Sequence, residues 1–167
     1  MFGFFKMGQC GGASSSLVQS RGKVEIIYSS TSGTSRAAAL KLQDFLEENH
    51  YLAPVINIGD FSKEDLSHYR GTIIFLLSTY GDGDSPADGE DFYKWVTTSE
   101  PEPTEFEWLS YTILAFGNSS FQNHCGFGLK TEKFLQKGKA QEIFELHKCD
   151  ALKKEKNWEA RFPDWSK

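Results

Sequence analysis

The sequence predicts an α/β protein in which a doubly wound parallel sheet of five strands carries helices on both faces. Short runs of β-branched and aromatic residues alternate with segments of helical composition, as consecutive βαβ units require. Several of these runs are continuously apolar, which is typical of parallel strands that are buried on both faces. A chain of 167 residues is long enough to bury the core of one such domain.

The first predicted strand is Val24–Tyr28, a run of mostly β-branched or aromatic residues. The other predicted strands are 53–58, 72–77, 111–116 and 142–146. A helix is expected from Arg36, where three alanines follow in succession, to about Asn49. Later helical segments are a capped short turn at 62–65, a helix opening at 90–96, one around 129–135 and a last one at 152–162.

Residues 1–22 are rich in glycine and serine and are predicted to be a disordered leader before a domain at 23–167. A net charge of −5 argues against nucleic acid as a partner, because its phosphates require a basic face. Three cysteines without a CxxC pair argue against a disulfide scaffold or a metal site and favour a reducing compartment such as the cytoplasm. No apolar run approaches the roughly 20 residues that cross a bilayer.

The loop after the first predicted strand, Ser29–Ser35, is rich in hydroxyl groups and leads directly into a helix. Free N–H groups and the helix dipole favour an anion at such a place. The loop has no lysine or arginine and lacks both the GxxxxGK[ST] and the GxGxxG patterns. It therefore suits a single phosphate monoester, although a simple helix cap and turn explains the same residues equally well.

Two further unusual loops, 78–89 and 117–126, follow the third and fourth predicted strands. The carboxyl ends of parallel strands share one edge of the sheet, so the three loops should meet there. Tyr80 and Phe121 are isolated aromatic residues in these loops, and two such rings suit a planar conjugated ligand between them. Each ring alone is more simply explained as a loop residue packed on the core.

Together the loop sequences SSTSGTS, STYGDGDSPADGEDFYKW and FGNSSFQNHCG resemble the FMN loops of the flavodoxin-like family. The resemblance covers about residues 23–165 and is strongest to the FMN domains of the diflavin reductases, such as cytochrome P450 reductase and sulfite reductase flavoprotein. It implies a flavodoxin-like sheet in the order 2-1-3-4-5 and FMN as the cofactor.

By this resemblance the first loop holds the FMN phosphate, Tyr80 and Phe121 stack on the two faces of the ring system, and Gly81 and Gly83 place backbone groups at its edge. The residues expected at the cofactor are Ser30, Thr31, Ser32, Gly33, Thr34, Ser35, Ser78, Thr79, Tyr80, Gly81, Asp82, Gly83, Gly117, Asn118, Ser119, Phe121, His124, Cys125 and Asp150. A purely structural role explains His124 and Cys125 more simply.

Four positions depart from the family pattern. Phe121 stands where the family usually has tyrosine, which keeps the ring but removes a hydroxyl. Ser32 replaces a usual threonine and keeps the hydroxyl. The resemblance places Asp150 beside the ring, in the loop after the fifth strand, but Ala151 and Leu152 follow it where the family often has further acids, which weakens that role.

The resemblance implies an electron-transfer flavoprotein that passes single electrons from an FAD- and NADPH-containing reductase to a haem or iron–sulfur protein. No catalytic residue of its own is expected. The acids Asp82, Asp84, Asp88, Glu90 and Asp91 are either a docking face for a basic partner or ordinary solvated side chains.

Several alternatives stay open. The chain is a free-standing carrier or a piece of a longer enzyme, such as the flavodoxin-like domain of a tRNA-wybutosine synthesis radical enzyme. A flavin quinone reductase and a flavin-free interaction module are further possibilities. A phosphoacceptor receiver domain is disfavoured, because it needs acids where this chain has Tyr28-Ser29 and Ser78-Thr79.

Overall fold

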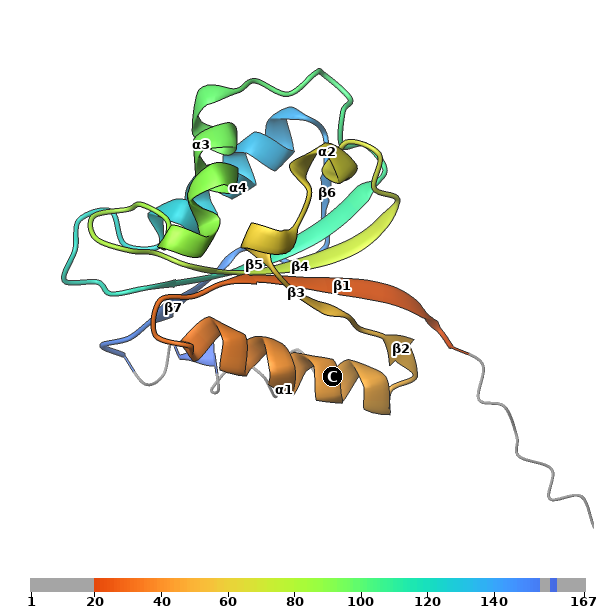
Figure 1. The fold of residues 1–167 in the computed structure, drawn as a ribbon, viewed down its shortest axis with the longest axis horizontal. Helices are drawn as coiled ribbons and strands as arrows, with labels where there is room; N and C mark the ends of the chain where they lie inside the picture. The colour runs from red at the N-terminus through yellow and green to blue at the C-terminus, as the bar shows by residue number, and fades with distance from the viewer. Residues whose placement is uncertain (1–19, 154–156, 159–167) are drawn as a thin grey trace, which may run out of the picture.

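A parallel sheet lies between two layers of helix in the computed structural model, which describes residues 20–153 and 157–158 (Figure 1). Within these residues, seven short strands form the sheet and every pairing between them is parallel. The strands are β1 (Gly22–Ser29), β2 (Tyr51–Leu52), β3 (Val55–Asn57), β4 (Gly71–Ser78), β5 (Leu109–Gly117), β6 (Gln141–Glu142) and β7 (His147–Asp150). The predicted α/β class is confirmed.

The strand order is β2-β1-β4-β5-β6, with β3 also beside β1 and β7 also beside β5. The predicted strand 53–58 contains β3, and β2 directly precedes it. The predicted strand 142–146 begins in β6 and ends just before β7. The order therefore agrees with the predicted 2-1-3-4-5 topology.

Two predicted strands have different bounds in the structure. The segment 53–58 is interrupted because Pro54 has no N–H group, and its carbonyl instead accepts a hydrogen bond of 2.9 Å from the Ile26 N–H. The segment 142–146 is paired only at its start, and pairing with β5 resumes at β7. Asp150 is therefore the last residue of a strand and does not lie in a loop beyond it.

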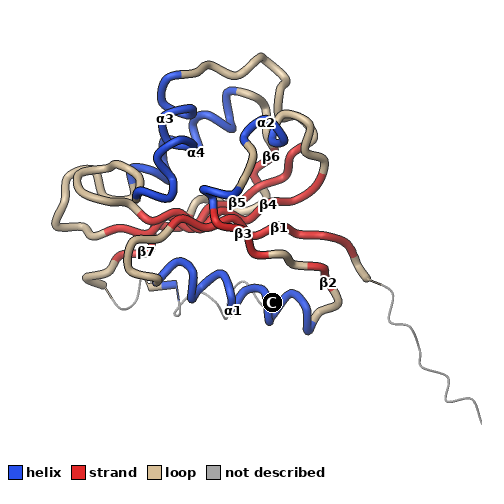
Figure 2. The backbone as a smooth tube through the Cα atoms, in the orientation of Figure 1, coloured by secondary structure: helices blue, strands red, loops and turns tan. Residues whose placement is uncertain are grey.

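The helices are α1 (Thr34–Glu48), α2 (Lys63–Leu66), α3 (Glu90–Thr98) and α4 (Gly126–Lys137), with 3₁₀ turns η1 (Ile58–Asp60) and η2 (Ala87–Gly89). Helix α1 covers one face of the sheet, and α3 and α4 cover the other (Figure 2). Helix α1 begins two residues before the predicted start at Arg36. Most of the predicted helix 152–162 and all but the end of the predicted leader lie outside the described residues; Gly22 already belongs to β1.

Helix α4 packs very closely on β5, because Gly128 faces the sheet. A Cβ atom at this position would lie 2.5 Å from the Cβ of Ala115. The buried rings of Phe127 and Phe134 fill the core on this side of the sheet. This contact holds the first turn of α4 against the carboxyl end of β5.

The loops that follow β1, β4 and β5 lie at the same end of the sheet, on the left in Figure 1. The sheet topology thus brings together three segments that are far apart in the sequence, as expected. Among the described residues, no helix has the length and apolar character needed to cross a membrane.

Candidate functional site

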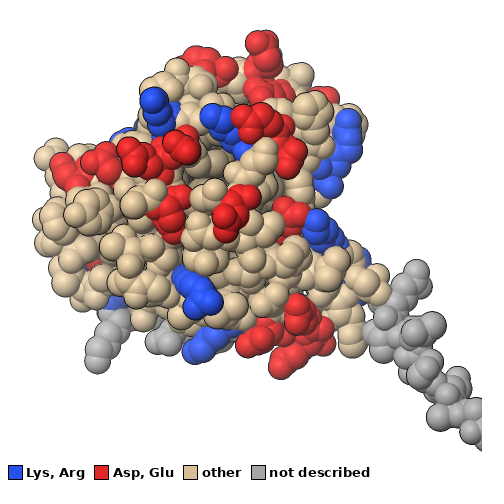
Figure 3. Space-filling model, in the orientation of Figure 1, with Lys and Arg blue, Asp and Glu red and all other residues tan. Residues whose placement is uncertain are grey.

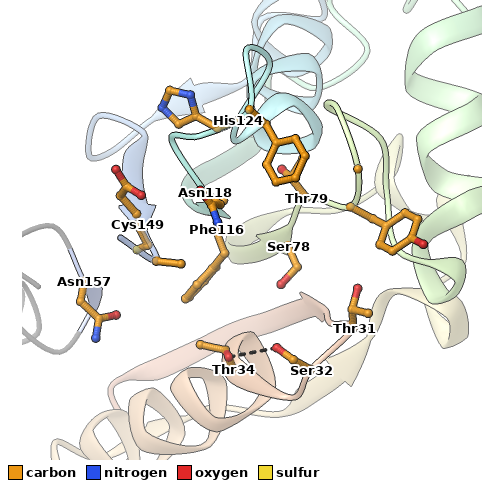
Figure 4. A pocket seen from close by; sticks show the side chains of 16 residues that line it. Thr31, Ser32, Thr34, Ser78, Thr79, Phe116, Asn118, His124, Cys149 and Asn157 are labelled. Carbon is orange, nitrogen blue, oxygen red and sulfur yellow. Dashed lines mark hydrogen bonds between the residues drawn. The ribbon is translucent and has the colours of Figure 1, made fainter. Parts of the chain in front are cut away.

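A hollow of about 260 Å³ opens at this end of the sheet, and all three loops contribute to its wall (Figure 4). Strand β7 and the turn after it close another side. The lining residues are Thr31, Ser32, Thr34, Ser78, Thr79, Tyr80, Gly81, Phe116, Gly117, Asn118, Phe121, His124, Cys149, Asp150, Ala151 and Asn157. Most of the residues that the sequence predicted therefore meet at one site.

The first loop is shaped largely by its own side chains. The Ser30 hydroxyl accepts a 2.9 Å hydrogen bond from the Gly33 N–H, and Ser32 and Thr34 share a hydrogen bond of 3.2 Å between their hydroxyls. Gly33 adopts the left-handed conformation at the helix start (φ +88°), and among the described residues no side chain caps α1. Thr31, Ser32 and Thr34 line the hollow, and their hydroxyls do not cap the helix (Figure 4).

Ser35 is turned away from the hollow and is fully buried. Its hydroxyl donates a 2.5 Å hydrogen bond to the Ser29 carbonyl and accepts one of 3.2 Å from Ser78. Ser35 therefore braces the first loop against β4 through its side chain. Ser30 and Gly33, also predicted at the cofactor, do not line the hollow.

Asp88 joins the end of the second loop to the start of the first. Its carboxylate accepts hydrogen bonds from the Ser29 hydroxyl (2.7 Å), the Ser30 N–H (3.0 Å) and the Asn57 side-chain amide (2.9 Å). A charged acceptor with three donors makes a strong anchor. This acid, expected either to dock a partner or to be solvated, instead holds the first loop in place.

The second loop presents Tyr80 and Gly81 to the hollow. Tyr80 and Asp84 exchange backbone hydrogen bonds of 2.9 and 3.0 Å, which close a narrow turn. Gly81 (φ +54°) and Gly83 (φ +104°) allow that turn, since side chains rarely tolerate these backbone angles. The Tyr80 ring is 61% exposed and is not packed on the core.

Asp82 and Gly83, both predicted at the cofactor, do not line the hollow. The Asp82 carboxylate accepts two hydrogen bonds of 3.0 Å from the backbone and side-chain amides of Asn123 in the third loop. A Cβ atom at Gly83 would lie 2.8 Å from the Asn123 Cβ. These two residues fasten the second loop to the third.

The third loop presents Phe121, whose ring is 47% exposed, and Asn118. Ser119 stands behind them, and its N–H donates a 3.1 Å hydrogen bond to the Asp150 carboxylate. Hydrogen bonds from Ser119 and from the Leu152 N–H lower the pKa of Asp150 in spite of its burial. Asp150 is therefore a charged brace at the rim of the hollow.

His124 lines the hollow, whereas Cys125 is buried behind it. The Cys125 thiol donates a 3.1 Å hydrogen bond to the Ala115 carbonyl, and burial raises its pKa to about 11. Such a thiol is not a nucleophile at neutral pH. The simpler structural explanation of Cys125 agrees with this geometry.

Sequence reasoning missed Phe116, Cys149, Ala151 and Asn157, which also line the hollow. Phe116 and Cys149 are pairing partners in β5 and β7, and their composition alone indicates buried strand residues. Only the pairing of the two strands places both at the carboxyl edge. Burial raises the pKa of the Cys149 thiol to about 12, so it is also unreactive at neutral pH.

The sequence model of one protein family, described as Flavodoxin, matches residues 26–165. The chain belongs to the flavodoxin family. Oxidised flavodoxin 1 from Bacillus cereus superimposes with a TM-score of 0.58 at 25% identity, over 77% of this chain and 84% of that structure. A flavodoxin from Streptococcus pneumoniae has the same fold, with a TM-score of 0.64 at 19% identity over 80% and 89% of the two chains.

Two curated relatives are reductases. The sulfite reductase [NADPH] flavoprotein alpha-component of Shewanella oneidensis is 26% identical over 153 residues, which are 92% of this chain and 24% of the relative. NADPH–cytochrome P450 reductase of Bos taurus is 26% identical over 125 residues, 72% of this chain and 18% of the relative. The chain spans less than a quarter of the length of these relatives.

FMN is the cofactor of flavodoxins and of the flavoprotein relatives, and the residues of the hollow fit it. Neutral hydroxyls gather at the start of α1, where a phosphate monoester is favoured. The Thr79 hydroxyl oxygen is buried at the hollow and has no hydrogen-bond partner within the described part of the chain. A polar ligand atom would satisfy this group, which is otherwise costly to bury.

Proposed function

We propose that residues 23–167 form an FMN-binding electron-transfer domain, which receives electrons from a reductase module or protein and passes them to an acceptor protein. The observation that carries this proposal is the convergence of a hydroxyl-lined socket and two exposed aromatic rings on one hollow. Bound FMN would supply the electron-transfer chemistry, and the chain would supply binding and orientation.

Each group of residues has a defined task in this proposal. The hydroxyls of Thr31, Ser32 and Thr34 hold the phosphate by hydrogen bonds without a counter-charge. The rings of Tyr80 and Phe121 cover the planar ring system and exclude water from it. Both rings are exposed and line the same hollow, and an exposed aromatic pair at one hollow supports a binding role.

The proposal is tested by titrating purified protein with FMN and following the quenching of flavin fluorescence. We expect Tyr80→Ala and Phe121→Ala each to raise the Kd for FMN at least about tenfold, since each removes a stacked aromatic surface. Trp108→Ala is the matched control: this ring is also 61% exposed, but it precedes β5 at the opposite edge of the sheet. A protein that binds no FMN, or an unchanged Kd in both loop variants, contradicts the proposal.

An acidic docking face for the acceptor belongs to the same proposal. Figure 3 shows acidic side chains gathered where the second loop and the start of α3 lie. Asp82 and Asp84 are exposed although they also bond within the protein, and Glu90 and Asp91 are exposed as well. Their charge would speed encounter with a basic acceptor.

The docking face is tested by the rate of electron transfer from the reduced protein to a basic haem protein, such as cytochrome c. We expect the rate to fall steeply with added salt. Glu90→Gln with Asp91→Asn should slow transfer at low salt, whereas Glu47→Gln with Glu48→Gln, which removes two charges from the far end of α1, should not. A rate that ignores both salt and these variants would favour ordinary solvated acids.

A further inference from the structure

Lys130 of α4 bonds to the second loop and also to Tyr93 of α3. Its Nζ atom lies 3.3 Å from the Gly83 carbonyl oxygen and donates a hydrogen bond to the Tyr93 hydroxyl. The same Nζ atom lies 4.6 Å from the centroid of the Tyr93 ring. Lys130 is partly buried, so hydrogen bonds to protein groups replace part of the hydration of its ammonium group.

Tyr93 of α3 carries the contact onward to the loop. Its hydroxyl accepts from Lys130 and donates a 2.8 Å hydrogen bond to the Asp84 carboxylate. The edge-on packing of its ring against Phe127, with centroids 5.6 Å apart, fixes the position of the hydroxyl. A chain of charge-assisted hydrogen bonds therefore runs from α4 through α3 to the loop.

The tight turn 80–84 of the second loop is held through its residues 82–84. Asp82, Gly83 and Asp84 are each bonded to a side chain outside the loop. Tyr80 and Gly81 are exposed, and nothing within 4 Å surrounds the Cβ position of Gly81. The contacts of residues 82–84 therefore fix the position of Tyr80 and Gly81 relative to the hollow.

We propose that Lys130, acting with Tyr93, is a positioning residue of the cofactor site. It holds the second loop in the turn that presents Tyr80 and Gly81, and it keeps a positive charge beneath that turn. Neither Lys130 nor Tyr93 lines the hollow, so both act through the loop. This inference rests on the proposed function, because the ligand that the loop receives is FMN.

The experiment compares Lys130→Met and Tyr93→Phe with the control Lys133→Met, a nearby and exposed lysine of the same helix. We expect Lys130→Met to raise the Kd for FMN about 5- to 30-fold, because binding must then order the loop. Its midpoint potential for bound FMN should be more negative, because a positive charge that favours the reduced, more anionic flavin is gone. Tyr93→Phe keeps the charge and should raise the Kd with a smaller change in potential. Lys133→Met should change neither.

Circular dichroism melts show whether each variant folds, and the outcomes separate the two proposals. A wild-type protein that binds no FMN removes the proposed function and this inference with it. If the wild-type protein binds FMN but Lys130→Met has the same Kd and midpoint potential as wild type, the inference alone is overturned. The inference is also overturned if Lys133→Met changes the Kd and the potential as much as Lys130→Met does. If Lys130→Met does not fold, an unchanged Kd in Tyr93→Phe overturns the inference.

Discussion

The first and second loops of the hollow are built in different ways. Within Ser29–Ser35, hydrogen bonds between neighbours set the geometry, with Asp88 as an anchor from further along the chain. The turn 80–84 depends on Asn123 and Lys130, which are 41 and 47 residues distant from their partners in the loop. The first loop is thus shaped mainly by contacts between neighbouring residues, whereas the turn of the second loop depends on contacts with residues distant in the sequence.

This contrast teaches how one site combines two kinds of recognition. A phosphate is small and of constant shape, so a locally specified turn with neutral donors can hold it. A ring system that stacks between two aromatic side chains requires a fixed distance between these side chains. Only contacts between residues distant in the sequence can fix that distance.

The largest difference is expected between two glycines with positive φ. In Gly83→Ala the new Cβ would meet Asn123 at 2.8 Å in addition to the backbone strain at φ +104°. We expect a loss of about 3 kcal/mol or more, from left-handed strain and overpacking together. Gly33→Ala meets nothing within 4 Å and should lose only about 1–2 kcal/mol of strain. Urea unfolding measures both, and equal losses would remove the contrast.

Asp88 tests the charged anchor that reaches the first loop from further along the chain. Asp88→Ala leaves the Ser29 hydroxyl and the Ser30 N–H without their charged acceptor, and should lower the free energy of unfolding by about 2–3 kcal/mol. Asp91→Ala, an exposed acid of the same region, should stay within about 0.5 kcal/mol of wild type. A loss no larger than that of Asp91→Ala would mean that local bonds alone shape the socket.

Asp150 links the third loop to the sheet in a pH-dependent way. Its pKa is lower in the folded protein than the ordinary value of 3.8, so its ionised form stabilises the fold above that value. This contribution is lost as the pH falls through the lowered pKa. Melting temperatures between pH 7 and pH 2 should therefore fall less steeply below about pH 4 in Asp150→Asn than in wild type. Parallel curves would show that Asp150 does not carry this charge-dependent contact.

Ser32→Ala should have the smallest effect on stability, within about 0.5 kcal/mol, because the side chain is exposed and loses one hydrogen bond of 3.2 Å. The same variant should raise the Kd for FMN about fivefold, since a phosphate donor is lost. Ser62→Ala also removes an exposed hydroxyl with one hydrogen bond, to Glu64, but this hydroxyl does not line the hollow; the variant should stay within about 0.5 kcal/mol of wild type and leave the Kd unchanged. An unaltered Kd in Ser32→Ala would remove Ser32 from the phosphate site.

The predictions from sequence succeed where the physical cause is local. Continuous apolar runs indicated the central strands, and hydroxyl-rich turns after them indicated the edge at which a ligand binds. The bounds of the second and fifth strands were wrong. Pairing breaks at Pro54 in one, and in the other it ends with the Ile143 N–H bonded to the Tyr111 carbonyl and resumes only at His147. Phe116 and Cys149 were missed because a residue at the end of a strand has the same composition whether it lines a ligand site or a core.

The order of elements, the chemistry of the socket and the two candidate rings could be read from the chain, since turn preferences and apolar periodicity act over a few residues. The roles of the acids could not. Asp82 and Asp88 have the composition of surface residues, and they became internal braces because folding brought them to partners 41 and 59 residues away. Contacts over such distances depend on how helices and strands pack, and no short stretch of sequence contains that information.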